Sequence, residues 1–312
     1  MLGANDIITY SGDVLKWSIP FFGSRVKDPL RWDLDRRLQV GRATSHAAIS
    51  GSPPFQVGHS QSIGLVRMHN EDSLLALSGA MAGKGSAPDF GLFLVADGMG
   101  GHRKGERASA IATQAVAREI GRYVFADLLE KTLDFTNMTG FEKLMQTALQ
   151  RCNENVTVTV PSGGTTVTAA MLLGGYAIIG HVGDSRAYLL DDGNIIQLTT
   201  DHSLVQRLQD LGEITSQQAA NHPQRNVLLR AVGQENGLQA DVTRHSLRPG
   251  ARLLLCSDGL WGSLDDDYMQ EIISHSVDVQ DACDSLVTAA NRAGGPDNIT
   301  TVLVQYNYNS DD

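Results

Sequence analysis

Cysteine is scarce in this sequence, and its spacing offers no disulfide framework. The 312 residues contain three cysteines, Cys152, Cys256 and Cys283, an odd number at wide intervals. Small secreted domains held by disulfides are much richer in cysteine, so a reducing compartment suits this chain better. We therefore expect the three thiols to lie in the protein core.

Long apolar runs are lacking as well. No stretch reaches the roughly 18 consecutive apolar residues that a membrane-spanning helix needs. From Met1 to Tyr10 there is no basic region followed by an apolar run, which is the pattern typical of a secretory signal. The sequence therefore predicts a cytoplasmic protein without a membrane partner.

Positive charge is in deficit. The chain has 25 Lys and Arg against 35 Asp and Glu, a formal net charge of −10. A nucleic-acid surface needs dense Lys and Arg to displace counterions from phosphates, so we expect no nucleic-acid partner. Any affinity for phosphate must come from a few local residues. Hydrophobic residues make up 42% of the chain, enough for a large core.

The first part of the chain differs from the rest. Residues 1–55 contain an apolar stretch, Trp17–Phe22, a mixed-charge stretch, Asp28–Arg37, and a Ser- and Pro-rich stretch, Ala43–Pro54, that is typical of a linker. No motif in them indicates a mechanism. A docking or autoregulatory arm and a poorly ordered extension both stay open. Residues 307–312 form a short acidic tail.

Residues 56–306 alternate strand-length and helical patterns. Helical spacing of apolar residues occurs in segments 108–116, 141–152 and 279–290. The pair Asp192 and Gly193 favours a tight antiparallel hairpin. Short apolar runs bounded by Gly, Asp or Ser predict strands at Phe90–Ala96, Thr165–Leu173, Tyr176–Val182, Arg252–Cys256 and Ile299–Val304. These patterns indicate an α+β fold in which helices sandwich antiparallel sheets.

Four aspartates stand at the ends of predicted strands, beside or close to glycine. Asp97 follows one strand and enters a glycine-rich turn. Asp184 and Asp258 also follow strands, and Asp297 stands just before the strand at 299–304. Any one of them can be an ordinary turn residue. Four converging carboxylates, however, repel one another and need a cation, and oxygen ligands favour Mg²⁺ or Mn²⁺.

Three further charged residues precede the predicted strand at 74–77. Glu71 and Asp72 add two carboxylates, and Arg67 stands four residues before the first of them. Arg67 can be a structural counter-charge among metal-bound carboxylates, or a fork that grips two phosphate oxygens. The residues alone leave both interpretations open.

Read in order, these motifs resemble the series found in the protein phosphatase 2C family, in its bacterial branch. The resemblance covers about residues 56–306 and implies a four-layer α-β-β-α sandwich, with two central antiparallel sheets and a flap subdomain. The motifs are Arg67-x-x-Asn70-Glu71-Asp72, Asp97-Gly98-Met99-Gly100-Gly101, Gly164-Thr165-Thr166, Gly183-Asp184-Ser185-Arg186, Ser257-Asp258-Gly259-Leu260-Trp261 and Asp297-Asn298.

The resemblance also implies a role for each candidate residue. Two divalent cations, Mn²⁺ or Mg²⁺, would share Asp97 as a bridging ligand. One of them would take the backbone carbonyl of Gly98, with Glu71 binding directly or through water. Asp258 and Asp297 would bind the second cation, and Asp184 with Asp258 would bind a third, weaker one. Asp72 would lie behind these ligands. Arg67 would bind the substrate phosphate.

The general acid and the flap are less defined. Animal members of the family carry histidine where this chain has Met99, so His102 and a metal-bound water are equal contenders for protonating the leaving oxygen. Residues 201–233 resemble the mobile flap beside the active site, which would affect substrate choice more than chemistry.

We therefore predict a protein serine/threonine phosphatase that attacks phosphorus with a metal-activated water and opposes a cytoplasmic kinase in bacterial signalling. The alternative is a catalytically silent scaffold that binds phosphoproteins, although such proteins usually lose one of the ligands at Asp97, Asp258 or Asp297. We expect a monomer because no heptad pattern is sustained. The sequence does not indicate the physiological substrate.

Overall fold

The computed structural model describes residues 55–79, 89–100, 103–130, 137–235 and 237–307. Most of the N-terminal segment, most of the acidic tail and His102 lie outside these ranges, so the predictions made for them stay predictions. In the described part of the chain, no helix is both long and apolar enough to cross a membrane.

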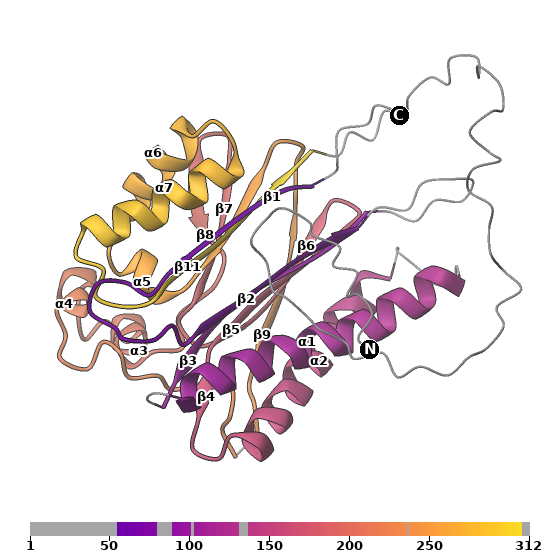
Figure 1. The fold of residues 1–312 in the computed structure, drawn as a ribbon, viewed down its shortest axis with the longest axis horizontal. Coiled ribbons are helices and arrows are strands. Elements are labelled where there is room, and N and C mark those ends of the chain that lie inside the picture. Colours follow the sequence, from indigo (N-terminus) through magenta and orange to yellow (C-terminus); the bar gives the residue numbers. More distant parts are fainter. Residues whose placement is uncertain (1–54, 80–88, 101–102, 131–136, 236, 308–312) are drawn as a thin grey trace, which may run out of the picture. The chain divides into compact units, whose positions relative to one another are not determined.

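Two antiparallel sheets lie face to face (Figure 1). We call them sheet I and sheet II. Sheet I has the strand order β1 (Phe55–Ser62), β11 (Ile299–Tyr306), β10 (Arg252–Cys256), β7 (Arg186–Asp191) and β8 (Asn194–Gln197). Sheet II has the order β2 (Asp72–Gly79), β3 (Phe90–Met99), β5 (Val167–Leu173), β6 (Tyr176–Val182) and β9 (Asp241–Ser246), with β4 (Gly164–Thr165) paired to β3.

Helices cover the outer face of each sheet (Figure 1). Sheet II carries the two long helices, α1 (Arg103–Glu130) and α2 (Met138–Thr159). Sheet I carries α5 (Asp258–Trp261), α6 (Asp266–His275) and α7 (Val279–Arg292). Two short helices, α3 (Leu204–Asp210) and α4 (Ser216–Ala220), belong to the flap between β8 and β9.

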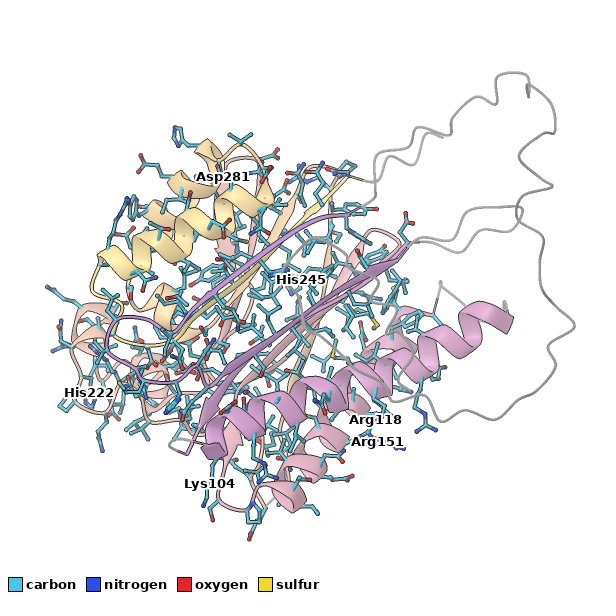
Figure 2. All side chains as sticks on the ribbon, in the orientation of Figure 1. Lys104, Arg118, Arg151, His222, His245 and Asp281 are labelled. Carbon is cyan, nitrogen blue, oxygen red and sulfur yellow. The ribbon has the colours of Figure 1, made fainter. Side chains whose placement is uncertain are left out.

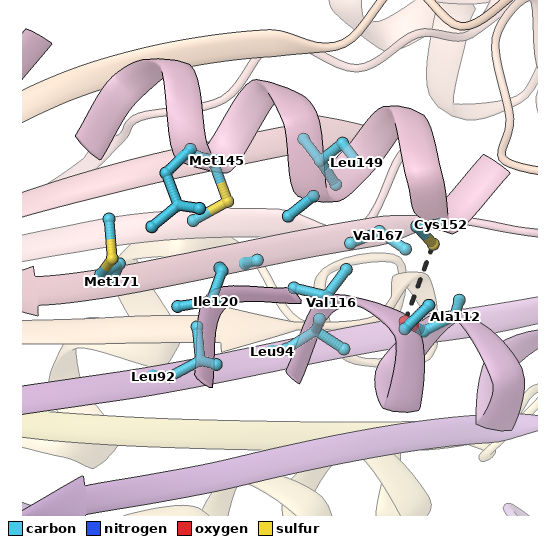
Figure 3. Close-up of a cluster of buried hydrophobic side chains, with 14 of the residues drawn as sticks. Leu92, Leu94, Ala112, Val116, Ile120, Met145, Leu149, Cys152, Val167 and Met171 are labelled. Atoms are coloured by element: carbon cyan, nitrogen blue, oxygen red, sulfur yellow. Dashed lines mark hydrogen bonds between the residues drawn. The ribbon is translucent and has the colours of Figure 1, made fainter. Parts of the chain in front are cut away.

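Three hydrophobic cores hold the four layers together. One lies between α1, α2 and sheet II, where Val116 and Ile120 meet Leu94 and Leu149 (Figure 3). The second lies between sheet I and its helices, and the third between the two sheets, around Phe93 and Val302. The predicted α+β sandwich is confirmed. The three cysteines are buried free thiols, as expected, and Cys152 Sγ donates to the Ala112 carbonyl at 3.7 Å.

Most predicted strands lie where the sequence placed them, and the hairpin at Asp192 and Gly193 forms with both φ angles positive, at 49° and 74°. The single strand predicted over Thr165–Leu173 is wrong in one respect, because it breaks at Thr166 into β4 and β5. Thr165 pairs with Gly98 on one side and forms an isolated bridge to Val232 on the other.

The glycine-rich segment after Asp97 is also not the turn that we predicted there. Strand β3 continues to Met99, and Asp97 lies opposite Asp72 in the β2–β3 pair. Gly98 is needed for close approach: a Cβ atom on it would lie 2.3 Å from the Gly105 carbonyl oxygen and 2.5 Å from that of Glu71.

Candidate active site

The predicted site residues meet at one end of the sandwich, around a cavity of about 370 Å³. Asp97 comes from the end of β3, Asp184 follows β6, Asp258 opens α5, and Asp297 precedes β11 (Figure 1). The cavity is lined by Arg67, Glu71, Asp97, Gly98, Met99, Gly100, Thr166, Asp184, Asn226, Leu228, Ala231, Gln234, Asp258 and Asp297. Seven predicted residues are thus brought together, whereas Asp72 is not part of the lining.

The backbone of Asp97 is held by three hydrogen bonds. Its backbone N–H donates to Thr166 Oγ1 at 2.9 Å, and its carbonyl accepts from the Thr166 N–H and from Thr165 Oγ1, both at 2.8 Å. Burial, and then the charges of neighbouring aspartates, raise the pKa of Asp97 well above its usual value. A carboxylate in this position is stabilised by a bound cation.

The carboxyl group of Asp258 also has a raised pKa. Burial, followed by repulsion from Asp297, raises the pKa of Asp258 to about 6. Its Oδ1 atom is buried and has no hydrogen-bond partner in the described structure. An unpartnered buried carboxylate oxygen is costly, and a metal ion would satisfy it.

Asp72 lies directly behind these ligands. Its Oδ2 atom accepts hydrogen bonds from Ser257 Oγ at 2.8 Å and from Thr300 Oγ1 at 2.6 Å. Burial raises the pKa of Asp72 to about 7. Because Asp72 faces Asp97 across the β2–β3 pair and bonds the residue before Asp258, it can position both.

Arg67 and Asp297 form an ion pair at the mouth of the cavity. Arg67 Nη2 lies 2.6 Å from Asp297 Oδ2, and the Arg67 side chain is 48% exposed. The hydrogen bond to Asp297 raises the pKa of Arg67. This geometry matches the counter-charge interpretation, and the exposure leaves the guanidinium accessible to an incoming anion.

Glu71 is fixed through its backbone. Its N–H donates to Asn298 Oδ1 at 2.8 Å, and its carbonyl accepts from Ser109 Oγ at 2.6 Å and from the Gly98 N–H at 3.2 Å. A Cβ atom on Gly105 would lie 2.9 Å from Glu71 Oε2. The carboxylate therefore lies against the first turn of α1, where the helix dipole favours negative charge.

Sequence reasoning missed a cluster that joins Asp184 to the flap. The Arg186 guanidinium holds Asp201 through Nε–Oδ1 and Nη2–Oδ2 contacts of 2.9 and 2.7 Å, and it lies 3.6 Å above the Trp261 ring. The Trp261 indole N–H donates to the Asp184 carbonyl at 2.9 Å. Both Arg186 and Trp261 stand within quoted motifs, which was the available signal.

The flap is attached to the site by its two ends. At the start, the His202 N–H donates to the Gly183 carbonyl at 2.7 Å, and His202 Nδ1 accepts from the Gly183 N–H at 3.2 Å. At the far end, Thr165 and Val232 exchange two backbone hydrogen bonds. Between these attachments, Asn226, Leu228 and Ala231 reach the cavity wall. The resemblance placed a flap at residues 201–233 without singling out these three residues.

The donor set fits a hard divalent cation, because every candidate ligand offers oxygen and several carboxylates repel one another. Within the described ranges, however, no three His, Cys, Asp or Glu side chains already form a metal-binding group. One of the candidates, Asp297, is engaged by Arg67. A cation that used this oxygen of Asp297 would have to displace Arg67 from it.

Comparisons with known proteins identify the family of the chain. The family model described as protein phosphatase 2C matches residues 70–303. The serine/threonine phosphatase stp of Listeria innocua is 36% identical over 250 residues, which cover 78% of this chain and 93% of that protein.

Solved structures agree as well. The serine/threonine phosphatase of S. agalactiae matches with a TM-score of 0.68 and 30% identity, covering 80% of this chain and 99% of that one. The catalytic domain of the phosphatase PstP, solved in complex with two manganese ions, matches with a TM-score of 0.64 and 30% identity over 81% of this chain and 99% of that one. The chain belongs to the protein phosphatase 2C family of metal-dependent serine/threonine protein phosphatases.

Proposed function

We propose that this phosphatase releases phosphate from phosphoserine and phosphothreonine in proteins at the cavity between Asp97 and Asp297, and that it opposes a kinase of the same signalling system. The observation that carries the proposal is the convergence of seven predicted residues on one cavity, although they come from segments far apart in the sequence. Residues 56–306 would form the catalytic domain and residues 201–233 its flap.

We assign the metal ligands as the sequence suggested. Asp97 would be shared by two divalent cations, with Gly98 and Glu71 completing one site and Asp258 and Asp297 the other. Asp184 and Asp258 would hold a third ion, and Asp72 would keep Asp97 and Asp258 in position. When bound, two such cations lower the pKa of a water and neutralise charge on the attacking and leaving oxygens.

Arg67 would bind the substrate phosphate. Its guanidinium is held by Asp297 at 2.6 Å, and a metal that takes over Asp297 would free the guanidinium for the dianionic phosphate. The same exchange adds positive charge at the cavity mouth, which favours anion binding. No histidine is found among the described residues that line the cavity. His102 as general acid stays a prediction.

The direct test is hydrolysis of a phosphothreonine peptide by the purified protein with Mn²⁺, with Mg²⁺ or with excess EDTA. We expect phosphate release with metal and none with EDTA. A folded protein that releases no phosphate with either metal would instead support the silent, phosphoprotein-binding scaffold. Size-exclusion chromatography with light scattering checks the expected monomer.

A further inference from the structure

A second hollow lies beside the active-site cavity. It has a volume of about 500 Å³, within the roughly 300–1,000 Å³ range of sites that bury small ligands. Residues of α2 form one side, and Gln234, Glu235, Gly237 and Leu238 form the other. We call it the α2 groove and define it by Gln150, Glu154 and Val158 on α2 and Gln234, Glu235 and Leu238 opposite.

The α2 groove and the active-site cavity share a wall. Gln234 lines both of them. The backbone on either side of this wall is fixed by Asn153, which is only 7% exposed. Asn153 Oδ1 accepts from the N–H groups of Gly233 and Gln234 at 2.7 and 3.2 Å, and its Nδ2 donates to the Gln234 carbonyl at 3.0 Å. A chain bound in the cavity can therefore continue into the α2 groove past Gln234, whose backbone is held in place.

The α2 groove is acidic. Glu154 and Glu235 are exposed on opposite sides of it, and none of the described residues that line it is basic. The nearby Arg151 (labelled in Figure 2) forms its ion pair with Glu119 of α1, at 3.2 Å. Val158, which is 80% exposed, and the half-buried Leu238 add apolar surface. This combination suits the aliphatic stem and charged head of Lys or Arg.

We propose that the α2 groove binds the segment of a phosphoprotein that flanks the phosphorylated residue, and that Glu154 and Glu235 select lysine or arginine in that segment. The inference rests on the proposed function, because it extends the same substrate-binding site. A phosphatase with a net charge of −10 gains from such a contact, since basic flanking residues also offset the repulsion between its surface and the phosphate.

The test uses peptides with a central phosphothreonine that differ only in their flanks: lysines on the N-terminal side, lysines on the C-terminal side, or alanines throughout. We expect one lysine peptide to exceed the alanine peptide in kcat/KM by roughly three- to tenfold at low salt, mainly through KM, because exposed ion pairs are individually weak. Raising the salt concentration should reduce the gain.

The decisive variant is E154Q/E235Q, in which both carboxylates become neutral amides of the same shape. It should lose the preference for lysine while hydrolysing the alanine peptide and p-nitrophenyl phosphate as the parent does. The matched control E271Q/D284N removes two exposed charges from α6 and α7, the layer of Asp281 in Figure 2, and should keep the preference.

Three results would overturn the assignment: no lysine preference on either side in the parent protein, a preference that survives in E154Q/E235Q, or an equal loss in the control. If the alanine peptide and p-nitrophenyl phosphate are both left intact, the proposed function itself fails and the inference falls with it. Hydrolysis of the alanine peptide without any gain from lysine refutes the α2 groove alone.

Discussion

The acidic residues in and behind the cavity differ in how freely they can change partners. Asp72, Asp97 and Asp258 are deeply buried and held by backbone or hydroxyl hydrogen bonds or by the start of a helix. Asp297 lies at the mouth and bonds a half-exposed arginine. The buried carboxylates repel one another, a cost that a bound cation would relieve. Asp297, in the proposed function, would exchange Arg67 for a metal and leave Arg67 to the phosphate. We call Asp72, Asp97 and Asp258 the floor of the site, and Arg67 with Asp297 its entrance. The floor is held in place, whereas the entrance can change partners.

The largest effect should come from the floor. In D97N, hydrolysis should fall by roughly 10⁴-fold or more, because the variant loses the ligand assigned to both cations. Without metal, the same variant should be more stable, since it removes one of several mutually repelling buried carboxylates. Activity assays check the loss of hydrolysis, and thermal unfolding in EDTA checks the gain in stability. Substantial activity in D97N would contradict the two-metal assignment.

The entrance should respond differently. In R67A, kcat/KM should fall by about 10- to 100-fold because a charge-assisted contact to phosphate is lost. Mn²⁺ should bind more tightly, since Asp297 no longer has a competing partner. Isothermal titration with Mn²⁺ measures the second effect. Weaker Mn²⁺ binding in R67A would mean that Arg67 orders the site and does not compete for Asp297.

A smaller effect should follow from changing the cluster of Arg186, Asp201 and Trp261. The variant W261F keeps a ring beneath Arg186 but removes the indole donor to the Asp184 carbonyl. We expect a fewfold weaker Mn²⁺ response, confined to the weakest metal site, from the loss of one hydrogen bond. The control W261A should also loosen the flap, which limited proteolysis can detect. Identical behaviour of W261F and the parent would show that Asp184 needs no such support.

The smallest effect concerns stability outside the cavity. Burial lowers the pKa of His181 to about 3, so the folded protein keeps this side chain neutral below the usual value of 6.5. The unfolded chain binds a proton there first, and stability should fall as the pH drops from 6.5 towards 3. At pH 5.5 the loss is about 1.4 kcal/mol.

Thermal unfolding between pH 7.5 and 5.5 checks this sign for His181. The comparison uses H181N, which should flatten the pH dependence, with H222Q on the flap (Figure 2) as a second histidine variant. A parent-like slope in H181N would assign the pH dependence to other groups.

Local patterns predicted much of the fold. Strands β6 and β10 match their predicted bounds because apolar runs between Gly, Asp or Ser encode them directly. The hairpin between β7 and β8 follows from two adjacent residues that tolerate positive φ. Such features depend on neighbours in the sequence, and one chain is enough to reveal them.

Contacts between distant segments were not predictable in this way. Whether Arg67 pairs with Asp297 depends on a loop that Asn298 fixes from 229 positions away, where Asn298 Nδ2 donates to the His69 carbonyl. The break at Thr166 depends on Val232 in the flap. The candidate ligands were identified through the resemblance, but their partners appear only once the chain is folded.

The pairing of β1 with β11 has a consequence for biosynthesis. Phe55 lies opposite Tyr306, so β1 can pair with its neighbour only after residues 299–306 have been made. Most of sheet II, with α1 and α2, can form earlier on the ribosome, whereas Asp297 is synthesised just before β11. A nascent chain that has not yet reached residue 297 therefore lacks one of the proposed ligands, and we expect it to have no phosphatase activity.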